Sequence, residues 1–556
     1  MDTTTKKINK PLILGGVILV MLLSALDQTI VATAMPKIVS EFNGLSHLSW
    51  VFTAYMLAST ITVPIYGKLS DIFGRRGLYF LGIFIFLLGS GLCGFASSML
   101  WLIVCRAIQG IGGGAMMVNS IAIIADVFPP AERAKWQGLM GGVFGLASIG
   151  GPLLGGWITD TFSWRWIFYI NLPLGIIAIA VLAAALPKIK PDRSKRSIDY
   201  LGAAFLTITL IPLLLALVWG GSQYPWKSWQ IISLFTVAAV GCFGFVMRER
   251  VAKEPIISLS LFKNKVFLTS VIITFITTMG MFGAILYIPT FAQGVIGVTA
   301  TYSGLILTPM MIAVIVTSAI SGQIIARTGK YKTLGIIGMI IAIVGMWWFS
   351  TIGVDTTESM LGMRMVVLGI GLGITMPIFT IAVQSAFSKK RMGEVTAGTQ
   401  LFRSIGGTVG TAIFGGVMNS QLASRLANIN SDPFVKTMQS TMPNSPITNI
   451  NPNTVQTLLT PEAQSQITAV FSKVPSYLQG QLSNSFNHFL GVIKLAFAQS
   501  VSHIFIIATI LMAAALLIMF FMPQIAIRKG DHPEFEEIGI ELEEELGQFD
   551  PEREPR

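Results

Sequence analysis

Long apolar segments alternate with short polar segments along almost the whole chain. A helix needs about 20 consecutive apolar residues to cross the hydrocarbon core of a bilayer. Fourteen segments of the 556-residue chain reach about this length, and they begin near Leu12, His47, Leu78, Leu100, Trp136, Trp166, Ile198, Trp229, Val266, Tyr302, Thr333, Ser359, Thr396 and Ser502. This pattern predicts an all-α membrane protein with 14 transmembrane spans embedded in a lipid bilayer.

The positions of lysine and arginine predict how these spans are oriented. When alternate loops are assigned to the two sides of the membrane, most of the 38 Lys and Arg residues fall on one side, together with both termini. Basic loops stay in the cytoplasm, so both termini are expected to be cytoplasmic. The lysines before the first apolar segment are not followed by a small-residue cleavage site. This segment is therefore expected to remain as a span and not to act as a signal peptide.

Two parts of the chain repeat the same polar signals. The stretch Gly67–Gly77 reads G-K-L-S-D-I-F-G-R-R-G, and the stretch from Gly322 reads G-Q-I-I-A-R-T-G-K-Y-K, which keeps the first two glycines and the trailing cations. Arg106 follows the first stretch and Arg364 the second, each near the outer start of a glycine-rich span. Transporter halves are commonly built as such repeats. The repeat unit is therefore expected to be six helices, which leaves two helices as an inserted pair.

This repeat predicts a domain organisation of two six-helix bundles, in the manner of the major facilitator fold, with one inserted pair. Because the membrane parts of the inserted helices carry almost no charge, we expect them to lie at the periphery and not to line a pathway. Between the last two spans, a long polar stretch is expected outside the cell, with an amphipathic helix or hairpin near its end. The predicted parts are an N-terminal bundle (1–187), the inserted pair (188–265), a C-terminal bundle (266–530) that includes the extracellular loop 419–500, and an acidic cytosolic tail (531–556).

Composition excludes several classes of protein. With 53% hydrophobic and only 12% charged residues, the chain is too apolar for a soluble globular protein. Its net charge of +11 is spread over short clusters between apolar segments, so no nucleic-acid partner is expected. The three cysteines and four histidines show no ligand spacing, so neither a metal site nor another cofactor is expected. No clustered nucleophile and base indicates a catalytic residue, and no G-x-x-x-x-G-K-[ST] motif indicates ATP binding.

The stretch Gly67–Gly77 concentrates charge and glycine in a chain that has little charge. Asp71 lies beside the cations Arg75 and Arg76, and Gly67 and Gly74 allow a tight reversal and a close approach of helices. We expect this segment to be a cytoplasmic gating loop, in which the carboxylate holds one helix end in a single conformational state. The alternative is an ordinary basic loop on the inner side of the membrane.

Asp27 is a carboxylate well inside a predicted span, and Arg106 is the cation expected to pair with it. At about 1.5 Å per residue, both lie roughly 9 to 12 Å below the outer ends of their helices, so they are at the same depth. An ionisable group in the membrane usually marks a transport pathway or a proton relay. We therefore expect Asp27 and Arg106 to couple proton movement. The alternative is a permanent ion pair with a structural role.

The fifth predicted span carries the sequence G-L-A-S-I-G-G-P-L-L-G-G-W-I. Gly151, Gly155 and Gly156 would allow close packing against another helix, and Pro152 removes one helix hydrogen bond and predicts a bend. Two interpretations remain open for this segment. It is either a tightly packed helix contact or a hinge that seals the protein against proton leak, and both roles are compatible.

These motifs together resemble those of the major facilitator superfamily. The stretch Gly67–Gly77 looks like its signature loop, the Arg106 segment looks like its span-4 motif, and G-P-L-L-G-G resembles the antiporter motif of its drug exporters. With L-D-Q-T-I-V-A-T-A-M-P-K-I in the first span and S-W-R-W-I-F-Y-I-N-L-P-L-G at Ser163–Gly175, the chain is similar to the 14-span drug/proton antiporter family of the EmrB/QacA type. The resemblance implies alternating access and proton import coupled to export. Arg403 in the thirteenth span, where some cation exporters carry acids, disfavours cationic drugs.

The expected function is therefore proton-coupled export of small lipophilic compounds by a monomer in the cell membrane, expected to be a bacterial plasma membrane. An alternative within transporters is export or flipping of a lipid or lipid-like envelope precursor. A membrane-embedded enzyme is the alternative of another class. The substrate pocket is expected between the two halves near mid-membrane, lined by Tyr55, Asn119, Tyr287 and Gln384.

Overall fold

The chain folds as a bundle of long helices whose computed structural model describes most, but not all, of its residues. Over the described residues it contains α-helices and short 3-10 and π-helical segments but no β-strand. The predicted tail 531–556 and most of the polar stretch before α18 lie outside these residues. The described residues are 9–42, 48–128, 130–186, 199–221, 223–298, 305–388, 391–427, 429, 432–436, 458–459, 461–471 and 476–524.

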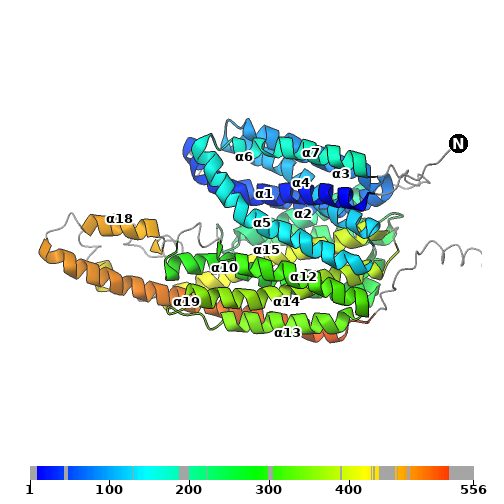
Figure 1. Cartoon of the computed structure of the whole chain (residues 1–556). Coiled ribbons are helices and arrows are strands. Elements are labelled where there is room, and N and C mark those ends of the chain that lie inside the picture. Colours follow the sequence, from blue (N-terminus) through cyan, green and yellow to red (C-terminus); the bar gives the residue numbers. More distant parts are fainter. Residues whose placement is uncertain are drawn as a thin grey trace, which may run out of the picture.

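The first group of helices, called here the N-terminal bundle, packs around α1 and α4. Contacts join α1 to α5 and α7, and they join α4 to α2 and α3. Figure 1 shows this bundle as the upper layer of the molecule. Its helices are α1 (Lys10–Phe42), α2 (Leu48–Phe73), α3 (Arg75–Gly94), α4 (Met99–Val127), α5 (Pro130–Thr161), α6 (Trp166–Tyr169) and α7 (Asn171–Ala185).

The second group, called the C-terminal bundle, forms the lower layer in Figure 1. Contacts join α10 to α15 and α19, and they join α14 to α12 and α13. A continuous apolar core fills its interior, with Phe349 stacked on Phe505 at 4.9 Å between ring centres. Its elements are α10 (Lys265–Phe291), η3 (Ala292–Ile296), α12 (Thr308–Thr328), α13 (Tyr331–Phe349), α14 (Glu358–Ser385), α15 (Met392–Arg425), α18 (Pro461–Phe471) and α19 (Ser476–Phe520).

Corresponding helices of the two bundles begin and end in the same way. Gly74 connects α2 to α3 with a φ of 88°, and Gly329 connects α12 to α13 with a φ of 66°. Both values lie in the left-handed region, which glycine adopts without steric cost. The side chain of Ser98 accepts a hydrogen bond at the N-terminus of α4, and that of Thr357 does so at the N-terminus of α14. The structure thus repeats at the positions where the sequence repeats.

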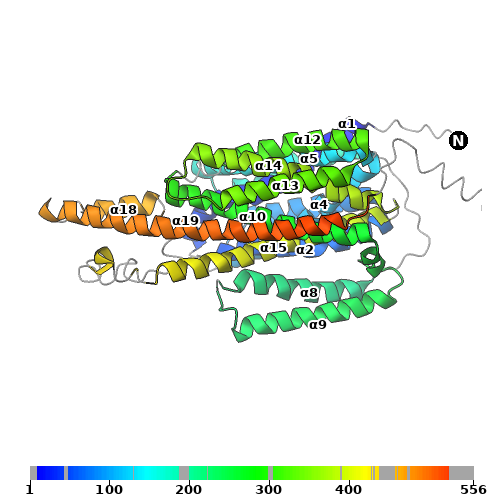
Figure 2. The ribbon, with the colours of Figure 1, turned by 90° about the horizontal axis from the view of Figure 1, so that it is seen from below.

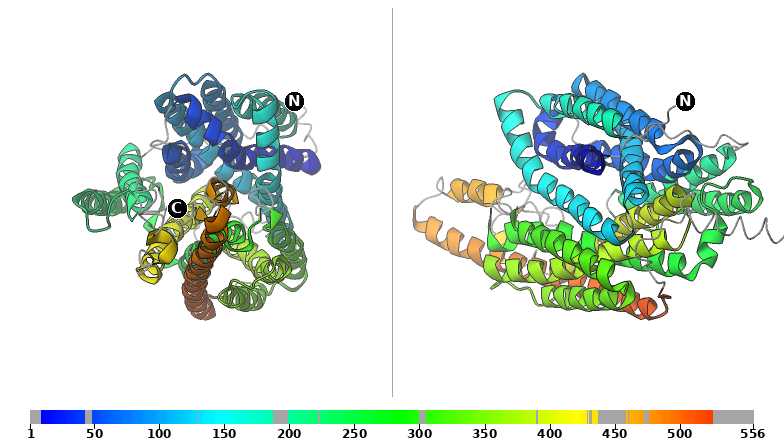
Figure 3. Two further views of the ribbon diagram at one scale, coloured as in Figure 1. Left: turned by 90° about the vertical axis from the view of Figure 1, so that its left-hand side faces the viewer. Right: turned by 45° about the vertical axis from the view of Figure 1, so that its right-hand side comes forward.

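Two further helices form an inserted hairpin beside the bundles. They are α8 (Tyr200–Trp219) and α9 (Trp229–Val251), and a segment containing η2 (Leu259–Lys263) leads from α9 to α10. Helix α8 contacts α2 and α15, whereas α9 packs mainly on α8. Figures 2 and 3 show the hairpin projecting from one flank of the molecule. Among the described helices, the hairpin touches both bundles mainly through α8.

The outer part of the C-terminal bundle differs from the sequence prediction. The last span was expected to begin near Ser502, after the loop 419–500, but α15 continues to Arg425, and α19 runs unbroken from Ser476 to Phe520. No proline interrupts α19, and its apolar side chains remain on one face beyond the bundle. Phe434 packs on Phe486 and Phe489 there, with ring centres 5.2 and 5.1 Å apart. Figure 2 shows α18 and α19 extending past the other helices.

Fewer of the described helices are long and apolar enough to cross a membrane than the 14 spans that the sequence predicts. Of the described helices, 12 are long and apolar enough to cross a membrane. Helices α2 and α5, of 26 and 32 residues, are not among those 12, although they pack alongside α4 and α1. The number of 14 spans, the domain boundaries and the orientation of the termini stay predictions. We call the end at which α1 begins the inner end, and the end from which α19 projects the outer end.

Candidate functional site

Asp27 lies at the centre of a buried hydrogen-bond network inside the N-terminal bundle. Its side chain is completely buried, and Oδ2 accepts a hydrogen bond of 2.6 Å from Nη1 of Arg106. Its other oxygen, Oδ1, accepts hydrogen bonds from Nε2 of Gln109 at 2.8 Å and from Nδ2 of Asn171 at 3.0 Å. The pairing predicted from the depth of Asp27 and Arg106 is therefore present. Three helices, α1, α4 and α7, meet at this carboxylate.

The partners of Arg106 hold the guanidinium in one position. Nη1 also donates to Oε1 of Gln109 at 2.7 Å, and Nε donates to the carbonyl of Val51 at 3.4 Å. The ring of Tyr55 lies over the guanidinium, with its centre 4.4 Å from Cζ, and the Tyr55 hydroxyl contacts Ser24 Oγ at 3.3 Å. A buried ion pair is stable only when such additional hydrogen bonds satisfy both groups. This geometry fits both the proton-coupling role and the structural alternative.

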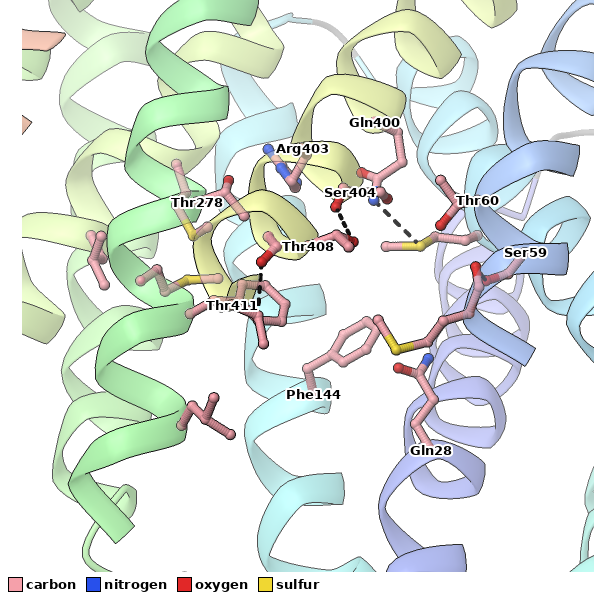
Figure 4. Close-up of a pocket in the computed structure, with 18 of the residues that line it drawn as sticks. Gln28, Ser59, Thr60, Phe144, Thr278, Gln400, Arg403, Ser404, Thr408 and Thr411 are labelled. Atoms are coloured by element: carbon pink, nitrogen blue, oxygen red, sulfur yellow. Dashed lines mark hydrogen bonds between the residues drawn. The ribbon is translucent and has the colours of Figure 1, made fainter. Parts of the chain in front are cut away.

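A large cavity lies between the two bundles, beside this network. Its volume is about 720 Å³, within the range that accommodates drug-sized ligands. Most of its lining is apolar, and the described lining residues include eight methionines and four aromatic side chains. Figure 4 shows Gln28 and Ser59 of the N-terminal bundle on one side and Thr278, Arg403 and Thr408 of the C-terminal bundle on the other. Methionine side chains are flexible and polarisable, so they adapt to ligands of different shape.

Only two of the four predicted pocket residues line this cavity. Tyr55 and Tyr287 are part of its wall. Asn119 and Gln384 are not: Asn119 is buried and bonds the carbonyl of Ala115 one turn earlier, and Gln384 bonds the hydroxyl of Thr396. Because Tyr55 lines the cavity and also covers Arg106, its ring lies between the cavity and the Asp27 network.

The inserted hairpin contributes to the cavity wall, which corrects the expectation that it is wholly peripheral. Leu217, Val218, Gly220 and Gly221, at the outer end of α8 and the turn after it, line the cavity. This end of α8 is held against the N-terminal bundle, because Trp219 packs on Trp50 with ring centres 5.3 Å apart. An uncharged apolar helix end can line a cavity whose wall is itself mostly apolar. The lack of charge in the hairpin was therefore no evidence against such a position.

The two bundles touch directly at their inner ends, where α2 meets the start of α15. Asp71 accepts hydrogen bonds of 3.0 Å from the backbone N–H groups of both Gly393 and Glu394. These groups belong to the first turn of α15, whose N–H groups have no partner within the helix and favour a carboxylate. Asp71 also forms an ion pair with Arg75 at 3.1 Å.

The glycines of the predicted gating loop have distinct roles. Gly67 lies inside α2, and a Cβ atom there would collide with Gly393 and Ala397, so glycine permits the close approach of α2 to α15. Gly74 makes the turn into α3 with its positive φ. Gly77, by contrast, has open space around it. Arg75 also pairs with Asp126, and Arg76 donates to the carbonyls of Leu186 and Ala183 at the end of α7.

The segment after α9 also contacts the junction between α2 and α15 at the inner end. Lys68 of α2 forms an ion pair of 2.7 Å with Glu254. The backbone N–H of Ser258 donates to Oε1 of Glu394 at 2.6 Å. The inserted hairpin is thereby tied to one bundle through Lys68 and to the other through Glu394.

The glycine motif of α5 packs against α1. A Cβ atom on Gly151 would collide with Thr29, and one on Gly155 would collide with Thr33 and Ile30. Gly156 has open space around it. The hydroxyl of Thr29 donates to the carbonyl of Ala147 at 2.8 Å, which fixes α1 to α5 at this point. The backbone stays helical through Pro152, and the tight-packing interpretation is the one these contacts support.

Several residues of the site were not singled out from the sequence as site residues. They are Gln109 and Asn171, which bind Asp27, and Gly393 and Glu394, which bind Asp71. Gln109 lies one helical turn after Arg106, so its spacing was a usable signal. Gly393 and Glu394 bind through backbone groups that every non-proline residue carries, so no side-chain pattern indicates them.

Long helices in two bundles, a cavity between them and a buried ion pair beside it define a multi-pass membrane transporter. The chain belongs to the Major Facilitator Superfamily, whose family model matches residues 17–411. Membership in this family places the chain among transporters and not among enzymes.

Two relatives agree with this assignment, and a solved structure shares the fold. Multidrug transporter protein MdtP of Bacillus subtilis (strain 168) is 40% identical over 536 residues, which cover 95% of this chain and 95% of that protein. Multidrug resistance protein 3 of the same strain is 41% identical, over 77% of this chain and 83% of that protein. The crystal structure of the human organic anion transporter MFSD10 matches 91% of this chain and 99% of that chain, with a TM-score of 0.56. Its sequence identity is 14%, so this last match shows a shared fold alone.

Proposed function

We propose that this protein exports lipophilic compounds from the cytoplasm of a bacterium in exchange for protons. The observation that carries the proposal is a completely buried carboxylate, Asp27, held behind the wall of a large and mostly apolar cavity between the two bundles. The apolar lining suits lipophilic substrates, and the names of the Bacillus subtilis multidrug relatives point to the same class.

Alternating access requires a state-specific contact at each end of the cavity. In this structure, Asp71 and the first turn of α15 join the bundles at the inner end. The bundles spread apart toward the outer end, as Figure 1 shows on the left. The cavity wall includes Gly220 and Asn419 near that end. We therefore assign the structure to a state that is closed toward the cytoplasm and releases substrate outward.

Tyr55 links proton movement to substrate binding in this mechanism. Its ring touches both the cavity and the guanidinium of Arg106, so a substrate that moves the ring also disturbs the Asp27 network. Release of Asp27 from Arg106 allows it to take up a proton, and return of the pair expels the proton. One proton entering at 100 mV releases about 2.3 kcal/mol, enough for a concentration ratio of roughly fifty for a neutral substrate.

The test uses purified protein in liposomes with an imposed pH gradient and a neutral lipophilic dye. We expect dye movement that depends on the gradient, stops when a protonophore is added, and is lost in Asp27→Asn. A matched control is Asp126→Asn, which removes a carboxylate at the inner end outside the Asp27 network. Dye movement that ignores the gradient, or survives in Asp27→Asn, would count against proton coupling.

A further inference from the structure

One of the described residues of the cavity wall carries a formal charge. Of the cavity-lining residues that the structure describes, Arg403 of α15 is the only one that is charged at neutral pH. Asp and Glu are absent from this set of lining residues, and Arg106 lies behind Tyr55. Arginine remains protonated in proteins, so the cavity has a fixed positive group.

The guanidinium of Arg403 has little compensation from the protein. Nη2 donates to the hydroxyl of Thr380 at 3.3 Å, and Nε is buried without a hydrogen-bond partner. Within the part of the chain that the structure describes, no carboxylate lies within ion-pair distance of it. A guanidinium presents five N–H donors, and a buried cation without a counter-ion is unfavourable. A ligand that brings an anionic group would supply the missing partner.

Two neighbouring hydroxyl groups of the wall do not compete for this role. The hydroxyl of Thr408 donates to the carbonyl of Ser404 at 3.1 Å, and that of Thr411 donates to the carbonyl of Gly407 at 2.9 Å. Because these hydroxyl protons are used within α15, the two oxygens face the cavity as acceptors. Figure 4 shows Arg403, Ser404, Thr408 and Thr411 on the same helix. Arg403 is therefore the strongest hydrogen-bond donor of this wall.

The rest of the wall favours an apolar molecule. Eight methionines and the rings of Tyr55, Phe144, Phe282 and Tyr287 supply a flexible apolar surface around Arg403. We propose that this cavity selects lipophilic organic anions, whose carboxylate or sulfonate forms a bidentate pair with Arg403 while the apolar body lies among the methionines. This substrate class rests on the proposed export function and narrows it.

The experiment uses three dansyl compounds that share one fluorophore and one six-carbon arm. The arm ends in a carboxylate, a primary amide or a trimethylammonium group. Binding to the purified full-length protein in lipid nanodiscs is measured by dansyl fluorescence. We expect the carboxylate to bind at least about tenfold more tightly than the amide, because a hydrogen bond to a charged group is worth at least that factor. The ammonium compound is expected to bind most weakly.

Variants of Arg403 test whether this residue causes the tighter binding of the carboxylate compound. Arg403→Gln should bring the carboxylate to the affinity of the amide, and Arg403→Lys should keep part of the difference. Arg364→Gln is the matched control, because Arg364 is another arginine within the C-terminal bundle, bonds Thr351 at 3.2 Å, and does not line the cavity. This control should keep the full preference.

Each outcome decides the proposal. Equal binding of the three compounds by the unmodified protein, or tighter binding of the ammonium compound, overturns it even if no variant folds. A parallel loss of all three affinities in Arg403→Gln assigns Arg403 a structural role and also overturns it. If the amide is moved by a pH gradient in liposomes without any charge preference, the anion selection fails and the export function stands. If none of the three is moved, the export function itself fails.

Discussion

The carboxylate of Asp71 and the backbone N–H of Glu394 lie 3.0 Å apart although 323 residues separate them in the chain. The contact joins the last turn of α2 to the first turn of α15, and so it joins the two bundles at their inner ends. A carboxylate at a helix N-terminus contributes about 0.3 to 2 kcal/mol. Such a contact is strong enough to bias two conformations and weak enough to break in each transport cycle.

Asp71→Asn should reduce the transport rate more than substrate affinity. The amide loses the negative charge that the first turn of α15 favours, so the inner-closed state becomes less populated. Spin labels on the inner ends of α2 and α15 should report longer distances in the variant. The comparison variant is Asp126→Asn, since Asp126 pairs with Arg75 of α3. An unchanged distance distribution and an unchanged rate would show that the contact does not gate transport.

Asp27→Asn should abolish transport and lower thermal stability. Removal of one partner of a buried ion pair leaves the other charge uncompensated, which costs about 3 to 5 kcal/mol. The double variant Asp27→Asn with Arg106→Gln removes both charges, and it should recover most of the stability but none of the proton-driven transport. Thermal unfolding and liposome transport measure the two properties separately. Recovery of transport in the double variant would support the structural alternative for this pair.

Gly151→Val should destabilise the protein, because its side chain would collide with Thr29 of α1. Overpacking of this kind costs about 1 to 3 kcal/mol. The control lies in the same motif: Gly156 has open space, so Gly156→Val should leave the thermal unfolding temperature nearly unchanged. Equal effects of the two substitutions would show that the contact between α1 and α5 is not the reason for the glycine.

Cysteine at Val218 should react with a water-soluble thiol reagent, and substrate should slow the reaction. This residue lies at the outer end of α8 and lines the cavity. Cysteine at Ile232 of α9, an exposed position away from the cavity, is the comparison; it should react without any effect of substrate. The reactions are followed by mass spectrometry, in a background where the native Cys242 is replaced because it is exposed. Identical labelling with and without substrate at Val218 contradicts the cavity wall described here.

Much of the fold could be predicted because the bilayer imposes the length and polarity of each helix. Helix depth was also enough to pair Asp27 with Arg106, since both positions could be counted from a helix end. The rotation of each helix about its axis could not be counted in this way, so Asn119 and Gln384 were placed in the pocket although they face other groups. The polar composition around residue 480 likewise hid the start of α19.

Helix α15 is one continuous helix of 34 residues, about 51 Å long, and it connects three regions of this protein. Its first turn holds Asp71, Arg403 lines the cavity 11 residues after the start of the helix at Met392, and its last turns reach the outer end. A substrate bound to Arg403, as proposed above, would be joined to the Asp71 junction by about three unbroken turns of one helix, so the cavity and the inner closure could respond together without a relay through loops.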